Sequence, residues 1–151
     1  MARELPLEEI KKLVGSEVCV TDWKVIDQDR INTFADCIET HHWIHEDPEK
    51  AARGPFGKTV VYGFLILSYI HFFNRDSVAP EKAKVIINYG LNKVRFINPV
   101  LVDAQIRDRI VLSKVEEQTG GKILLTTVHT MEIKGQEKPA CVAESLMLYF
   151  V

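Results

Sequence analysis

The sequence has few of the features that would mark a secreted or membrane-spanning chain. Its 151 residues include only 3 cysteines, at positions 19, 37 and 141, and such wide spacings exclude both a disulfide framework and a CxxC pair. We therefore expect three free, buried thiols. The longest apolar run, residues 59–73, contains a glycine and a histidine and is shorter than the roughly 20 residues that cross a bilayer. It predicts a buried element of the core.

An excess of charge of one sign is also missing. The chain has 19 Lys and Arg, 21 Asp and Glu, and a net charge of −2, with no basic stripe along the sequence. A surface that binds nucleic acid needs such a stripe, so we expect no nucleic-acid partner. The first residues, MARELPLEEIKK, lack the apolar centre and cleavage site of a secretory signal. We expect a cytoplasmic protein without a membrane partner.

The composition is that of a globular protein. Hydrophobic residues make up 46% of the chain and charged residues 26%, a balance typical of soluble domains. A chain of this length closes a hydrophobic core without disulfides or metal. Because no internal repeat, low-complexity segment or linker interrupts it, we expect a single domain over residues 1–151.

The first half of the chain has the periodicity of helices. After Asp27, apolar residues recur at i, i+3, i+4 and i+7, which predicts a helix with Asp27 as its N-cap. Asp47 followed by Pro48 predicts the start of a third, brief helix over 48–53. Residues 60–73 are apolar on every side, so we expect a central helix enclosed by protein. An amphipathic helix and a strand are predicted earlier, over residues 6–15 and 17–23.

The second half is rich in β-branched and aromatic residues. Short polar links separate the successive runs, and links of this length join antiparallel neighbours. The predicted fold is therefore α+β, with an antiparallel sheet of about five strands wrapped around the long central helix. The four runs are residues 84–100, 104–117, 122–134 and 140–151.

Three segments, WIHEDPEKAA, GPFGKTVVYGFLILS and NYGLNKVRFINPV, resemble the MaoC-like branch of the hot-dog fold. The likeness is to the small nodulation-protein-N type, which is related to the (R)-specific enoyl-thioester hydratases. It covers nearly the whole chain and is most specific from Phe34 to Ser68. The resemblance implies a hot-dog domain that assembles as a homodimer and uses no cofactor.

The resemblance also implies catalytic positions. In the hydratases, an Asp five residues before a His activates a water, and a backbone N–H at the start of the central helix holds the thioester oxygen. Carried onto this sequence, the histidine is His45, the glycine is Gly63, and the Asp position is Thr40. Tyr62 is a second departure, because the family usually has a His before this glycine.

The departure at position 40 changes the expected chemistry. Imidazole titrates near neutral pH, so His45 can act as the acid and base, and the Gly63 N–H lies at the positive end of a helix dipole. The Thr40 hydroxyl does not ionise near pH 7 and can only orient a water, or it is simply a helix-end residue. Glu46, His41 and His42 are alternatives only if the loop is rearranged.

Other side chains near these positions are candidates for substrate contact. We expect them to be Trp43, Tyr62, Phe64 and Ser68, although Trp43 also suits the core or a subunit contact. The stretch HHWIH lacks the i, i+4 register of a zinc-binding pair, so no metal site is expected. His71 and His129 stand alone on apolar elements, which favours structural roles.

The function that the resemblance implies is reversible hydration of a trans-2-enoyl thioester, presented by CoA or a carrier protein. The missing Asp leaves the enzymatic activity itself open. One alternative is changed chemistry on the same pocket, such as conjugate addition, cyclisation or isomerisation. The other is non-catalytic binding of an acyl group or a small apolar molecule.

Overall fold

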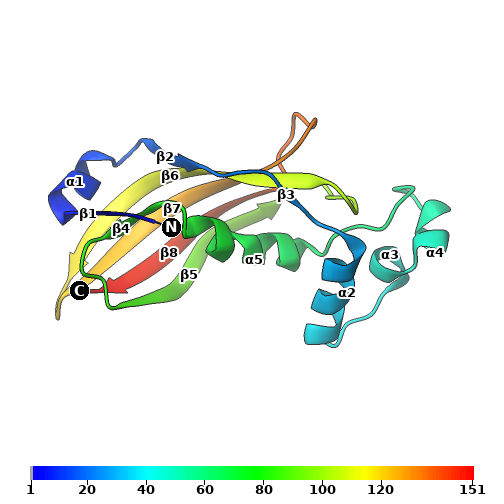
Figure 1. Ribbon diagram of the computed structural model, residues 1–151, viewed down its shortest axis with the longest axis horizontal. Helices are drawn as coiled ribbons and strands as arrows, with labels where there is room; N and C mark the ends of the chain where they lie inside the picture. Colours follow the sequence, from blue (N-terminus) through cyan, green and yellow to red (C-terminus); the bar gives the residue numbers. More distant parts are fainter. Residues whose placement is uncertain (1) are drawn as a thin grey trace.

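A curved antiparallel sheet with one helix on its concave side forms the body of the protein. The computed structural model describes residues 2–151, and Figure 1 shows helix α5, Gly63–Asn74, lying along the sheet. The strand order is β2-β6-β7-β8-β5, and β3 also pairs with β6. This confirms the expected α+β hot-dog arrangement. The strands are β2 Glu17–Val20, β3 Lys24–Val25, β5 Val85–Phe96, β6 Gln105–Gln118, β7 Lys122–Ile133 and β8 Cys141–Phe150.

Alternating burial fixes which face of the sheet meets α5. In β6, every second residue from Ile106 to Leu112 is buried, which is the period of a strand with one face in the core. Gly120 and Gly121 adopt φ of 77° and 68° between β6 and β7, a conformation that glycine adopts without strain. The predicted runs of the second half therefore match the strands to within a few residues.

Helix α5 differs from its prediction in two ways. It begins at Gly63 because the β-branched pair before it is extended: Val60 bridges Leu101, and the Val61 N–H donates to the Val100 carbonyl at 2.8 Å. The expected enclosure on all sides is wrong for one stripe of the helix. Phe64 is 71% exposed, and Ser68 and His71, one and two turns further on, are exposed as well.

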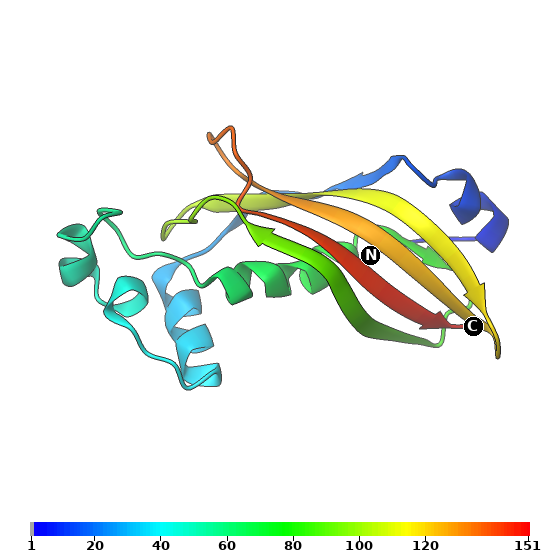
Figure 2. The same cartoon turned by 180° about the vertical axis from the view of Figure 1, so that it is seen from behind.

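Three short helices extend beyond the N-terminal end of α5 (Figure 2). Asp27 caps the first by accepting from the Arg30 N–H, and Asp47 caps the third by accepting from the Lys50 N–H, which confirms both predicted caps. The second helix was not predicted, because four residues are too few to show a helical period. The three are α2 Gln28–Cys37, α3 Trp43–Glu46 and α4 Pro48–Ala52.

The opposite end of the sheet carries the N-terminal segment. Helix α1, Leu7–Lys12, packs there, and strand β1, Arg3–Leu5, pairs in parallel with β4, Val78–Pro80. Neither β1 nor β4 was predicted, because three-residue strands give no pattern. Ile10 of α1 is fully buried in a second apolar cluster with residues of β6, β7 and β8.

The cysteines are free, but they are not all buried. Cys141 is buried, Cys19 is partly buried and Cys37 is exposed, so the expectation of three buried thiols is wrong for Cys37. Burial raises the pKa of Cys141 to about 11. Of the helices in residues 2–151, none combines the length and hydrophobicity needed to span a bilayer.

Candidate active site

His45 lies in α3 and is fixed through one ring nitrogen. Its Nδ1 is 2.5 Å from the Val60 carbonyl oxygen. A carbonyl can only accept, so Nδ1 carries the proton and Nε2 is left as the basic nitrogen. Within residues 2–151, no hydrogen bond is recorded for Nε2. The Gln28 amide donates to the His45 carbonyl at 2.7 Å and ties α3 to α2.

The Tyr62 ring covers one face of His45. The two ring centroids are 3.7 Å apart and the planes are inclined by 23°, so the rings are stacked. The Tyr62 hydroxyl donates to the Thr40 carbonyl at 2.8 Å. Burial, and then the negative charge of Glu46, raises the pKa of Tyr62. The phenol therefore keeps its proton and stays a donor at neutral pH.

Thr40 lies in the turn that ends α2, two residues after the C-cap Ile38. Glu39 has a φ of 53°, the Glu39 N–H donates to Asp36 and the Thr40 N–H donates to Ala35. This pair of bonds is a Schellman motif, with a left-handed residue after the helix. The Thr40 hydroxyl donates to the Ile38 carbonyl at 3.2 Å. Thr40 thus ends the helix, and its hydroxyl can accept a hydrogen bond from a water while its proton is engaged.

The alternative groups of this loop bond to one another. His41 Nδ1 lies 2.9 Å from the Glu46 carboxylate, which also accepts from the His42 N–H. The hydrogen bond to Glu46 raises the pKa of His41. His42 caps α3 by accepting from the Ile44 N–H. In the described part of the chain, none of these side chains is hydrogen-bonded to the His45 ring.

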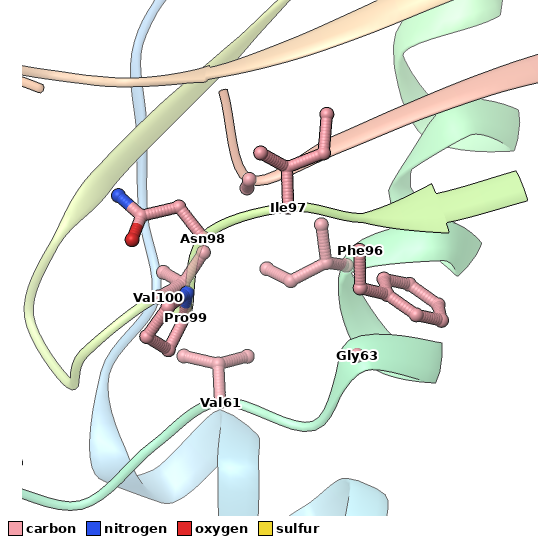
Figure 3. Close-up of a pocket in the computed structure, with 9 residues that line it drawn as sticks. Val61, Gly63, Phe96, Ile97, Asn98, Pro99 and Val100 are labelled. Atoms are coloured by element: carbon pink, nitrogen blue, oxygen red, sulfur yellow. The ribbon is translucent and has the colours of Figure 1, made fainter. Parts of the chain in front are cut away.

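Gly63 opens α5 beside an apolar cavity of about 210 Å³ (Figure 3). A Cβ at Gly63 would lie 3.3 Å from the Phe96 ring, so a side chain here would press on the cavity wall. The side chain of Tyr62 provides no cap for the helix, and the N–H groups of the first turn carry its positive dipole end. The cavity is lined by Val61, Ile66, Phe96, Pro99, Val100 and Ala140.

The structure brings some of the predicted site residues together and not others. Tyr62 contacts both His45, through its ring, and the main chain of Thr40, through its hydroxyl, and Gly63 follows Tyr62 directly in the chain. His45 does not line the cavity beside Gly63, because Val61 points into that cavity (Figure 3), whereas Tyr62 contacts His45. Trp43 packs against Gly54 instead, so closely that a Cβ added at Gly54 would lie 3.1 Å from the Trp43 ring.

Phe64 and Ser68 lie on the exposed stripe of α5. Together with His71 and Asn88 they line a cavity of about 220 Å³ between α5 and β5. Phe64 packs loosely against Phe96, with ring centroids 6.0 Å apart. The Ser68 hydroxyl donates to the Leu65 carbonyl within the helix. These two residues form a separate group from His45 and Tyr62.

Sequence reasoning missed the residues that form the cavity wall. Phe96 and Pro99 belong to the segment RFINPV, which carried part of the resemblance but was given no place in the pocket. Ala140 immediately precedes β8, the strand that pairs with β5, and donates its N–H to the Met131 carbonyl. Only the pairing of the strands brings these segments to the start of α5.

In architecture and site, the molecule is a hot-dog protein with a histidine held beside the start of its central helix. The model of the MaoC like domain matches residues 9–134, and the chain belongs to this family. It is 42% identical to 3-hydroxyacyl-thioester dehydratase Z of Mycobacterium tuberculosis over 141 residues, which is 93% of each chain. Nodulation protein N of Rhizobium leguminosarum bv. viciae is 37% identical over 143 residues, with 93% of this chain and 88% of that protein covered.

A solved structure agrees in fold. The MaoC-like dehydratase from Rhodospirillum rubrum superposes with a TM-score of 0.76 at 17% identity, and the match covers 97% of each chain. At this identity the likeness concerns the fold alone.

Proposed function

We propose that this protein catalyses the reversible hydration of a 2-enoyl thioester, which in the other direction is dehydration of a 3-hydroxyacyl thioester. The observation that carries the proposal is the placement of His45. Its Nδ1 is held by Val60, its ring lies on Tyr62, and the next residue, Gly63, begins the central helix beside a cavity. The dehydratase name of the 42% identical relative supports the same reaction class.

In the proposed mechanism, His45 moves both protons. Its Nε2 accepts a proton from water while the water oxygen bonds to C3. The electron pair of the double bond shifts toward the thioester, and the enolate oxygen accepts a hydrogen bond from the Gly63 N–H. The imidazolium then gives a proton to C2. The net change is the addition of one water, with no electrons transferred to an acceptor, so the reaction needs no redox cofactor.

Thr40 sets the expected rate. A positioned acid or base group contributes on the order of 10²–10⁴-fold, and a threonine supplies neither function. The Thr40 hydroxyl can accept a hydrogen bond from the attacking water, which orients it. We therefore propose a hydratase that works with one acid–base residue and is slower than an enzyme with a carboxylate at position 40.

The proposal is tested with purified protein and crotonyl-CoA. Hydration by the native chain, and a faster rate in Thr40→Asp, is the expected result. If only Thr40→Asp is active, the native pocket binds an acyl thioester without hydrating it. If both are inactive while crotonyl-CoA still binds, the protein is an acyl-binding homologue and the proposal is wrong.

We also propose that the protein forms a homodimer through β5. Among the described strands, β5 pairs only with β8, and it exposes Ile86, Tyr89 and Leu91 at 51%, 60% and 42%. The exposed stripe of α5, which includes Phe64, lies next to β5, because residues of α5 and β5 together line one cavity. A second copy that extends the sheet would cover both apolar surfaces.

Light scattering tests the assembly. The expected mass is twice the 17.2 kDa of one chain, and Leu91→Lys is expected to lower it to one chain. A native protein that stays monomeric at micromolar concentration would contradict the dimer.

We further propose that the whole chain is one domain and that it acts in the cytoplasm, on a thioester of CoA or of a carrier protein.

A further inference from the structure

Thr40 and Tyr62, two positions at which the sequence departs from the family pattern that it resembles, are joined by a hydrogen bond. In that pattern, position 40 is typically an Asp and position 62 is usually a His. Here the Tyr62 hydroxyl donates to the Thr40 carbonyl at 2.8 Å. Because the acceptor belongs to the main chain, this bond does not depend on which side chain stands at position 40. An imidazole at position 62 is shorter than a phenol and would end before that carbonyl.

Tyr62 is held firmly enough to act as a support. Its side chain is 8% exposed, and the Phe34 ring packs near it, with centroids 5.5 Å apart. His45 stacks on Tyr62 with ring centroids 3.7 Å apart, while the carbonyl of Val60, two residues before Tyr62, accepts the hydrogen bond from Nδ1–H. A stacked aromatic pair contributes beyond its buried area. The ring plane and one edge of His45 are therefore fixed by the same short segment.

The loop over residues 38–42 depends on the same residue. Residues 38–42 are exposed, and their other recorded hydrogen bonds run to α2, to α3 or within the loop. In the described chain, the bond from Tyr62 is the only hydrogen bond that ties this loop to the body beyond α3. A loop with few buried contacts opens easily. Removal of the hydroxyl should free it.

We propose that Tyr62 is a positioning residue that clamps two parts of the site at once. Its ring holds the plane of His45 so that Nδ1–H faces the Val60 carbonyl, the acceptor that sets the tautomer, and its hydroxyl fixes the main chain at Thr40, where the family pattern typically has a carboxylate. The clamp keeps the single acid–base group in place without that carboxylate. Its effect on rate rests on the proposed function, whereas its effect on His45 and on the loop does not.

Nuclear magnetic resonance tests the clamp without substrate. Nitrogen shifts of the His45 ring report which nitrogen carries the proton, and amide exchange reports the opening of residues 38–42. Tyr62→Phe keeps the ring, so the Nδ1–H tautomer is expected to persist while exchange in the loop rises about fivefold, the factor of one neutral hydrogen bond. Tyr62→Leu removes ring and hydroxyl, and both signals are expected to change.

Steady-state kinetics with crotonyl-CoA give the second readout. Tyr62→Phe is expected to lower kcat about fivefold with an unchanged KM, and Tyr62→Leu to lower it further. Tyr69→Phe is the matched control, since Tyr69 is a buried tyrosine, 6% exposed, within α5, the helix that Tyr62 directly precedes. It should leave the tautomer, loop exchange and kcat unchanged.

The outcomes separate the two proposals. If Tyr62→Phe and Tyr62→Leu both leave the His45 tautomer and the exchange of residues 38–42 as in the native chain, the clamp is refuted, whatever the activity. If the native protein does not hydrate crotonyl-CoA but the tautomer and the loop respond as described, the clamp stands and the proposed reaction fails. An equal response to Tyr69→Phe would also overturn the clamp, because the effect would then be general.

Discussion

Two histidines of this protein illustrate opposite uses of an imidazole. His45, near the start of α5, is partly exposed and bonds through Nδ1 to a carbonyl. His129, in the middle of the sheet, is 0% exposed. Its Nδ1 lies 2.6 Å from the Asp108 carboxylate and its Nε2 lies 2.9 Å from the Thr127 hydroxyl. The His45 ring therefore has one nitrogen without a hydrogen bond in the described chain, whereas both nitrogens of His129 are bonded.

The buried arrangement has the order of a catalytic triad, carboxylate to imidazole to hydroxyl. It lacks what a triad needs, because Asp108 and Thr127 are also buried, at 0% and 3% exposure, and no substrate reaches the hydroxyl. Burial raises the pKa of Asp108, against the hydrogen bond from His129. The comparison favours the histidine with an unbonded nitrogen, near the start of α5, over the complete but sealed triad as the candidate for function.

The buried group has a place in the architecture. On β6, β7 and β8, polar residues stand between members of the two apolar clusters: the first cluster includes Met131 and the second includes Leu125 on the same strand. We name Asp108, Thr127, His129 and Ser145 the polar belt. Asp108, His129 and Thr127 are hydrogen-bonded to one another, and polar groups bonded in this way fix the register of what packs around them in a core. Among the described residues, the Ser145 hydroxyl has no such partner. The polar belt therefore lies between two parts of the core: the apolar cluster that packs on α5 and the apolar cluster that contains Ile10 of α1.

The largest expected effect is on activity at His45. His45→Asn keeps a donor near the position of Nδ1 but has no basic nitrogen, so kcat/KM for crotonyl-CoA should fall by about 10²–10⁴-fold. The melting temperature should change little, because the ring is only partly buried. His41→Asn, in the same loop, is the control and should stay within about twofold of the native rate. An equal loss of activity in His41→Asn would indicate that His41 is the catalytic base instead of His45.

The next effect is on stability at the polar belt. His129→Leu leaves the Asp108 carboxylate buried without its partner, and breaking such a pair lowers the free energy of unfolding by about 3–5 kcal/mol. Urea unfolding at pH 7 measures it. His71→Leu, at an exposed position, should shift the same quantity by no more than about 0.5 kcal/mol. A loss below about 1 kcal/mol in His129→Leu would mean that the belt does not hold the sheet together.

The polar belt should also make stability depend on pH. The pKa of Asp108 is raised in the folded protein, so as pH rises past about 4 the unfolded chain loses this proton first. The folded state then binds more protons, and the free energy of unfolding falls by up to about 1.4 kcal/mol per pH unit until pH passes the folded pKa. Asp108→Asn should lack this slope. Parallel profiles for the two proteins would contradict the assignment.

The smallest expected effect is on activity at Gly63, in the candidate site that contains His45. In Gly63→Ala the new methyl group would lie 3.3 Å from Phe96, so the ring must shift by a small amount. Alanine favours a helix over glycine by up to about 1 kcal/mol, and stability should not fall. The N–H is kept, so kcat/KM should drop only about twofold to tenfold through displacement of the oxyanion position. An unchanged rate would indicate that the thioester oxygen binds elsewhere.

Much of the fold followed from local pattern. The period of two in residues 104–117 and 122–134 marked β6 and β7, and Asp27 and Asp47 marked two helix starts, because each signal lies within a few neighbouring residues. The exposed stripe of α5 could not be foreseen. Hydrophobicity along a helix shows that a face is apolar, but not whether the same chain or another one covers it.

The proposed members of the candidate site came from the family pattern, and their contacts did not. His45, Thr40 and Gly63 came from the order of residues in the family pattern. The stacking of Tyr62 on His45 and its bond to Thr40 depend on the path of three separate segments, and no local pattern encodes it. The cavity wall at Phe96 and Ala140 likewise exists only because β5 and β8 pair with Phe96 opposite Cys141.

A crystal structure with an unreactive analogue of a 2-enoyl thioester tests the central proposal most directly. The account predicts the thioester oxygen at about 3 Å from the Gly63 nitrogen, with Nε2 of His45 facing the C2–C3 bond directly or through one water. An analogue bound away from Gly63, or separated from His45 by the Tyr62 ring, would contradict it.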